Sequence, residues 1–69
     1  DGQRNTVLNW AAHAVGGDVH LGKTSTADAI AALGQLATAA ERAGLSRSEV
    51  DRTIESGFAA GFAGKKVAA

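Results

Sequence analysis

Two serine-centred start signals divide this 69-residue chain into helical segments and limit the folds open to it. Ser46-x-x-Glu49 is a full capping box, and Ser25-x-x-Asp28 is the same pattern with aspartate in the last position. In such a box the serine hydroxyl accepts a hydrogen bond from the backbone N–H three residues later. The chain contains no proline, and no segment alternates polar and apolar residues. The sequence therefore predicts an all-α fold, a compact bundle of three to four helices.

The first predicted helix has a polar start and a glycine-rich end. Asn5 or Thr6 can cap its start, and apolar residues follow at helical spacing from Val7. Gly16-Gly17-Asp18 indicates the end, because glycine readily adopts the left-handed conformation of a helix C-cap. Since Val19 continues the apolar stripe, the end can also lie one turn later.

The second predicted helix follows Ser25, runs to about Ala43 and is closed by Gly44. Gly34 lies in its middle, where glycine costs about 1 kcal/mol relative to alanine. We attribute this glycine to a close crossing with another helix.

The third predicted helix begins after Ser46. Gly57 either bends it or separates a short fourth helix that ends at Phe62. We interpret Gly57-x-x-x-Gly61 as a helix-packing pattern, because its polar surroundings do not suit a membrane helix pair. Residues 2–62 are expected to form a single domain, and residues 63–69 a C-terminal tail or helix end.

Much of the 45% hydrophobic content is alanine, so the expected core is thin. It is assigned to the larger apolar residues: Val7, Leu8, Trp10, Val15, Val19, Leu21, Ile30, Leu33, Leu36, Leu45, Val50, Ile54, Phe58 and Phe62. Stacking on a nucleobase is the alternative use of the tryptophan.

Charge and composition narrow the possible partners. Seven basic and seven acidic residues give a net charge of zero, which limits strong autonomous binding to nucleic acid. Cysteine is absent, and His13 and His20 have no convincing third ligand nearby, so we expect no metal site and no cofactor. No apolar run approaches the roughly 20 residues needed to span a bilayer, and there is no signal-peptide pattern.

Two polar groups are candidates for recognition. Arg4, Asn5 and Asn9 lie around the start of the first helix, where backbone N–H groups favour anions such as phosphate. Their alternative role is to cap the helix and face solvent. Together with a second group, near the end of the chain, these residues suggest one shared polar patch.

The second group lies in the third helix. Thr53 and Ser56 share one helix face, and Gly57 beside them leaves room for a partner to approach. Arg52 is included as a binding residue and could form a basic patch with Lys23, Lys65 and Lys66, the alternative being scattered solvated charges. The alternative is that the serine bonds to its own helix while the glycine admits a neighbouring helix. No catalytic motif accompanies either group, so the domain is not expected to be an enzyme.

A helix-turn-helix interpretation is also open. Ala40-x-x-x-Gly44-Leu45-Ser46-x-x-x-Val50 fits that template and would direct Arg47, Ser48, Asp51 and Arg52 to the major groove. The acidic residues of the same helix oppose it, because phosphates would repel them.

Three stretches together resemble a known module. They are Gly2-x-Arg4-Asn5-x-x-Leu8-Asn9-x-Ala11-Ala12, Ala43-Gly44-Leu45-Ser46, and Thr53-Ile54-x-Ser56-Gly57-Phe58-x-Ala60-Gly61. The chain is similar to the small helical domain beside the primase-polymerase (prim-pol) catalytic domain of phage and plasmid replication proteins, often ahead of a helicase. It departs from that family between Gly16 and Thr24, which is short and polar where a longer apolar helix is expected.

The resemblance implies a non-catalytic accessory role in DNA replication. Such domains help to bind single-stranded template DNA and the initiating nucleotide, while the prim-pol domain performs nucleotidyl transfer with divalent metal and NTPs. Carried over by position, Arg4, Asn5 and Asn9 match the first motif, and Ser56 and Gly57 match the second. The chain would then be a fragment of a larger primase-helicase in the cytoplasm of a bacterial host. A module that docks primase onto helicase, with no ligand of its own, is a third possibility.

Overall fold

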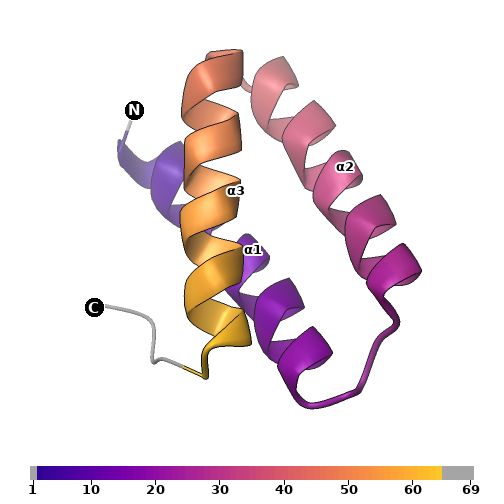
Figure 1. The fold of residues 1–69 in the computed structure, drawn as a ribbon. Coiled ribbons are helices and arrows are strands. Elements are labelled where there is room, and N and C mark those ends of the chain that lie inside the picture. Colours follow the sequence, from indigo (N-terminus) through magenta and orange to yellow (C-terminus); the bar gives the residue numbers. More distant parts are fainter. Residues whose placement is uncertain (1, 65–69) are drawn as a thin grey trace.

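Three helices make up the described chain, and the predicted all-α fold is confirmed. The computed structural model describes residues 2–64, with side chains from residue 4 onward. Helix α1 spans Gly2–His20, α2 spans Thr26–Arg42 and α3 spans Arg47–Phe62. The chain runs down α1, up α2 and down α3, and α1 and α3 cross at close range with α2 alongside (Figure 1). The expected tail from residue 65 lies outside the described residues.

Both predicted serine caps are present. The Ser25 hydroxyl accepts a hydrogen bond from the Asp28 N–H at 3.1 Å, and the Ser46 hydroxyl accepts one from the Glu49 N–H at 3.2 Å. Each bond satisfies one of the N–H groups that the first turn of a helix leaves without a partner. These caps fix where α2 and α3 begin.

The turn between α2 and α3 has the hydrogen bonds of a Schellman motif. The Gly44 N–H bonds the Glu41 carbonyl at 3.0 Å, and the Leu45 N–H bonds the Ala40 carbonyl at 3.1 Å. Gly44 has φ +103°, a conformation that only glycine adopts without strain. Because Leu45 is buried in the core directly after this turn, the motif fixes how α3 leaves α2.

Glycines let α1 and α3 approach backbone to backbone. A Cβ atom on Gly16 would overlap the Phe58 carbonyl oxygen, and one on Gly61 would overlap the His13 carbonyl oxygen. On Gly57 it would lie 2.7 Å from the carbonyl oxygen of Asn9. The interpretation of the Gly57–Gly61 pair as a packing pattern is therefore confirmed.

The structure decides between the predicted helix ends and corrects the role of Gly34. Helix α1 continues through Gly16 and Gly17 to His20, so the later of its two predicted ends is confirmed; these glycines serve the crossing, and the chain turns at Gly22, with φ +73°. Gly57 does not divide α3, which is continuous to Phe62, so it does not separate a short fourth helix. Gly34 does not mark a crossing, since a Cβ atom there would meet nothing within 4 Å.

The core is smaller than the list of large apolar residues predicted. Its buried cluster consists of Leu8, Ala40, Leu45 and Val50, with Leu36, Ala37 and Ile54 packed against it. Five residues assigned to the core are instead exposed: Val7, Trp10, Leu21, Ile30 and Phe62. The close glycine and alanine contacts bring the helices too near one another to admit all the larger side chains. Within the described residues no helix has the length and apolar character needed to cross a bilayer.

Candidate functional site

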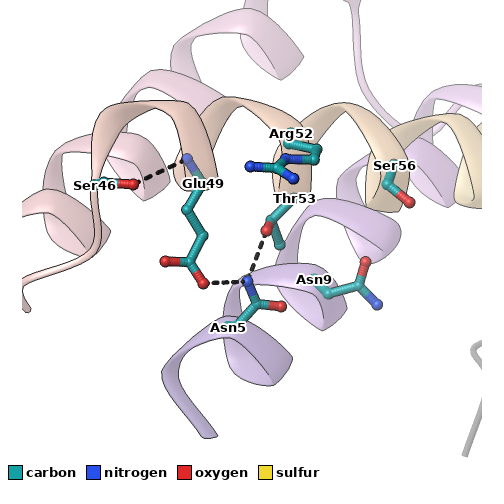
Figure 2. A pocket seen from close by; sticks show the side chains of 7 residues that line it. All are labelled: Asn5, Asn9, Ser46, Glu49, Arg52, Thr53 and Ser56. Atoms are coloured by element: carbon teal, nitrogen blue, oxygen red, sulfur yellow. Dashed lines mark hydrogen bonds between the residues drawn. The ribbon is translucent and has the colours of Figure 1, made fainter. Parts of the chain in front are cut away.

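A polar groove runs along one side of the α1–α3 crossing (Figure 2). It is open to solvent and has a volume of about 460 Å³. Its lining comes from α1, from α3 and from the cap of α3: Asn5, Asn9, Ser46, Glu49, Arg52, Thr53 and Ser56.

Asn5 fixes one end of the groove by joining the two helices. Its Nδ2 atom donates to Glu49 Oε2 at 3.0 Å and to Thr53 Oγ1 at 2.8 Å. All three side chains are partly buried. Since α1 begins at Gly2, Asn5 lies within the helix and not at its cap, which corrects the predicted start of α1. Its side chain is therefore free to reach α3.

Asn9 and Ser56 extend toward each other further along the groove (Figure 2). Asn9 lies one helical turn after Asn5 and packs against α3 at Gly57, where its Oδ1 atom is 3.0 Å from the position of an added Cβ. Because Gly57 has no side chain, the Asn9 amide can lie beside the α3 backbone. Ser56 is exposed at the adjacent position.

The groove carries one formal charge of each sign, on Glu49 and on Arg52. The Glu49 carboxylate accepts the hydrogen bond from Asn5, whereas Arg52 is exposed. Among residues 4–64, the side chains of Asn9, Arg52 and Ser56 have no hydrogen-bond or ion-pair partner. The groove therefore offers an amide, a hydroxyl and a guanidinium group to an outside molecule, with no net charge.

Arg4 does not line this groove. Its guanidinium Nη1 donates to the carbonyl of Ala43, the C-cap residue of α2. A cation at this end of a helix satisfies a free carbonyl and interacts favourably with the helix dipole. Arg4 therefore lies in the first turn of α1, as predicted, but its guanidinium is directed to the C-cap of α2 and not to the N–H groups at the start of its own helix.

The structure brings together most of the two predicted polar groups. Asn5, Asn9, Arg52, Thr53 and Ser56 line the same groove. Gly57 is buried against Asn9 and Ala12, so the space beside it admits α1, as in the alternative interpretation, and not an outside partner. Sequence reasoning did not include Ser46 and Glu49, which it treated only as capping residues. Glu49 precedes Thr53 by four residues and so shares its helix face, a spacing that could have identified it.

The helix-turn-helix pattern is present locally. Gly44 turns the chain, Leu45 and Val50 are buried, and Ser46 caps α3. The four residues assigned to the major groove are all exposed: Arg47, Ser48, Asp51 and Arg52. Arg52 is the member of that set that also lines the polar groove.

No family model, curated protein or solved structure matches this chain significantly. Among the described residues, no three His, Asp or Glu side chains are placed to hold a metal ion together.

Proposed function

We propose that this domain is a non-catalytic accessory module of a phage or plasmid primase-polymerase or primase-helicase. In this role it binds single-stranded template DNA and the initiating nucleotide during primer synthesis. One observation carries the proposal: Asn5 of the first motif and Thr53 of the third are 48 residues apart in the sequence, yet Asn5 bonds directly to Thr53 and to the neighbouring Glu49. The groove that results exposes polar groups that no contact within the described fold uses.

The chemistry of the groove suits recognition and not catalysis. Amide, hydroxyl and guanidinium groups are the groups that proteins use to contact bases, sugars and phosphates. With no net charge, the groove would bind modestly by itself and depend on the neighbouring domain for the rest of its affinity. The prim-pol domain of the parent protein would supply the divalent metal, the NTPs and the nucleotidyl-transfer chemistry in the bacterial cytoplasm.

Duplex binding through the helix-turn-helix segment is the alternative that a specific observation favours. Arg47 and Arg52 are exposed on α3 directly after a Gly44-Leu45 turn with the expected burial pattern. Exposed acidic residues on the same helix, Asp51 and Glu55, weaken it because they would face phosphates. A docking module between primase and helicase is the third candidate.

A single NMR titration of the 69-residue chain separates these functions. The proposal predicts that ATP and a short single strand both shift backbone amide signals around the groove, near Asn9, Thr53 and Ser56. Shifts with duplex alone, centred on Arg47 and lost in Arg47→Ala, would favour the helix-turn-helix function. If none of the three ligands produced shifts, the binding proposal would be wrong and the docking function would be favoured.

A further inference from the structure

The uncommitted groups of the groove indicate which part of a nucleotide it takes. Asn9 presents an amide, which has a donor NH2 group and an acceptor oxygen side by side. Ser56 adds a hydroxyl that can donate or accept. Among the described residues neither side chain has a hydrogen-bond partner, and Figure 2 shows them extending from facing helices toward the same space.

The charge of the groove disfavours a phosphate in this position. A phosphate site is usually formed by several cations or by helix N-terminal N–H groups. Here the Glu49 carboxylate lies in the same groove as Arg52 and offsets its charge. Asn5 cannot supply a free donor, because its Nδ2 group already donates to Glu49 and Thr53.

Asn9 also packs against the facing helix. Gly57 lets its amide rest against the α3 backbone, with Oδ1 at 3.0 Å from the place of an added Cβ. This contact restricts the rotamers open to Asn9, so the side chain loses less conformational freedom when it binds, which favours recognition. Arg52 is exposed in the groove, where its guanidinium can contact the sugar-phosphate of a nucleotide whose base lies in the groove.

We infer that the groove takes the hydrogen-bonding edge of a nucleobase at Asn9 and Ser56, with the phosphates held outside it. This inference rests on the proposed function and names the part of the nucleotide that this site recognises. The base can belong to the template strand or to a free nucleotide, since both present the same chemistry.

The test compares probes that contain a base with probes that do not, by NMR titration of the 69-residue chain. Adenosine is the base without phosphate, chosen because asparagine amides pair bidentately with adenine. Inorganic tripolyphosphate is phosphate without a base. An oligo-dA strand and an equally long strand of abasic sites form the second pair. A tighter Kd for oligo-dA than for adenosine identifies the template as the main source of the base, and the reverse identifies the free nucleotide.

We expect adenosine and oligo-dA to shift the side-chain NH2 signals of Asn9, and tripolyphosphate and the abasic strand to leave them unchanged. Equal shifts and equal Kd values for the probes with and without a base would overturn the inference but leave the proposed function intact. Binding of oligo-dA that moves signals elsewhere, but not those of Asn9, would have the same meaning. Failure of every probe to bind would overturn both.

Variants give an independent measure. Asn9→Ala should weaken the Kd for adenosine at least about fivefold, the lower limit for losing a bidentate base contact. Gln35→Ala is the matched control, because Gln35 is an exposed amide on α2 outside the groove. The Kd of this variant for adenosine should equal that of the unmodified chain. Ser56→Ala is a second groove variant that removes an exposed hydroxyl and keeps the helix contact, so it tests the inference even if Asn9→Ala fails to fold. Unchanged Kd in a folded groove variant would contradict the inference.

Discussion

The carbonyl oxygen of Asn9 lies 2.7 Å from the point that a Cβ atom on Gly57 would occupy. This contact shows how the fold and the groove depend on each other. The absence of a side chain at 57 allows α1 and α3 to cross closely, and the same closeness places the amides of α1 beside the hydroxyls of α3. The groove is thus a direct result of the glycine crossing.

The crossing makes Gly61 much less tolerant of alanine than Gly34. A Cβ at 61 would overlap the His13 carbonyl and lie 2.9 Å from the Gly17 nitrogen, so both helices would have to move apart. We expect Gly61→Ala to lower the free energy of unfolding by about 3 kcal/mol or more. Gly34→Ala, in an exposed helix interior with open space around it, should raise it by about 0.5–1 kcal/mol. Urea unfolding followed by circular dichroism measures the free energy of unfolding of both variants. Equal changes in the two variants would contradict the close crossing at Gly61.

Asn5 holds α1 to α3 by donating to a carboxylate and a hydroxyl. Asn5→Asp keeps the shape of the side chain but replaces the donor by a second carboxylate facing Glu49. We expect it to destabilise the domain more than Asn5→Ala, because the two carboxylates repel each other in addition to the lost bond to Glu49, and this repulsion outweighs the bond that the Thr53 hydroxyl can still donate. The extra destabilisation of Asn5→Asp relative to Asn5→Ala should shrink as the salt concentration rises from about 0.01 M to 1 M, because the Debye length falls from about 30 to 3 Å. If the two variants had the same stability at low salt, Asn5 would not face Glu49.

Much of the fold could be predicted because its signals are local. The serine caps and the Gly44 turn depend on hydrogen bonds within a few residues, and sequence shows them directly. Gly16 and Gly17 left the end of α1 open between two positions, because a glycine that ends a helix and a glycine that admits a neighbour look the same in sequence. Only the position of α3 decides between the two.

The groove could be predicted only in part, because its residues are visible in the sequence but their meeting is not. Asn9 and Ser56 were recognised as polar residues on helices, but the meeting of α1 and α3 is a tertiary event. The hydrogen bond of Arg4 could not be predicted because its partner, the Ala43 carbonyl, is 39 residues away. Glu49 was explained by its capping role, which hid its second role as the acceptor for Asn5.

Replacing Val50 by alanine should cost more stability than replacing the larger Trp10. Val50 is fully buried, whereas Trp10 is 58% exposed. Val50→Ala is expected to cost about 1.5–3 kcal/mol, the burial energy of such a side chain with its cavity. Trp10→Ala should change the stability by no more than about 0.5 kcal/mol, as for other surface positions. Thermal unfolding tests the pair, and a larger loss at Trp10 would mean that the tryptophan belongs to the core after all.

Arg4 is expected to act on stability and not on ligand binding. Removing its bond to the Ala43 carbonyl in Arg4→Ala should cost about 0.5–1 kcal/mol, typical of a cation at a helix C-terminus. The Kd for a short single strand should stay within about twofold of the unmodified chain in the same buffer. A loss of binding with unchanged stability would instead place Arg4 in the ligand site.

The central claim is that two distant stretches of sequence form one ligand surface. A double-mutant cycle on Asn9→Ala and Ser56→Ala, with Kd for a fluorescently labelled oligo-dA strand measured by anisotropy, tests it most directly. We predict that each variant weakens binding and that the two effects are coupled by about 0.5 kcal/mol or more, as for residues that share one partner. Single variants that both bind as tightly as the unmodified chain would contradict the claim.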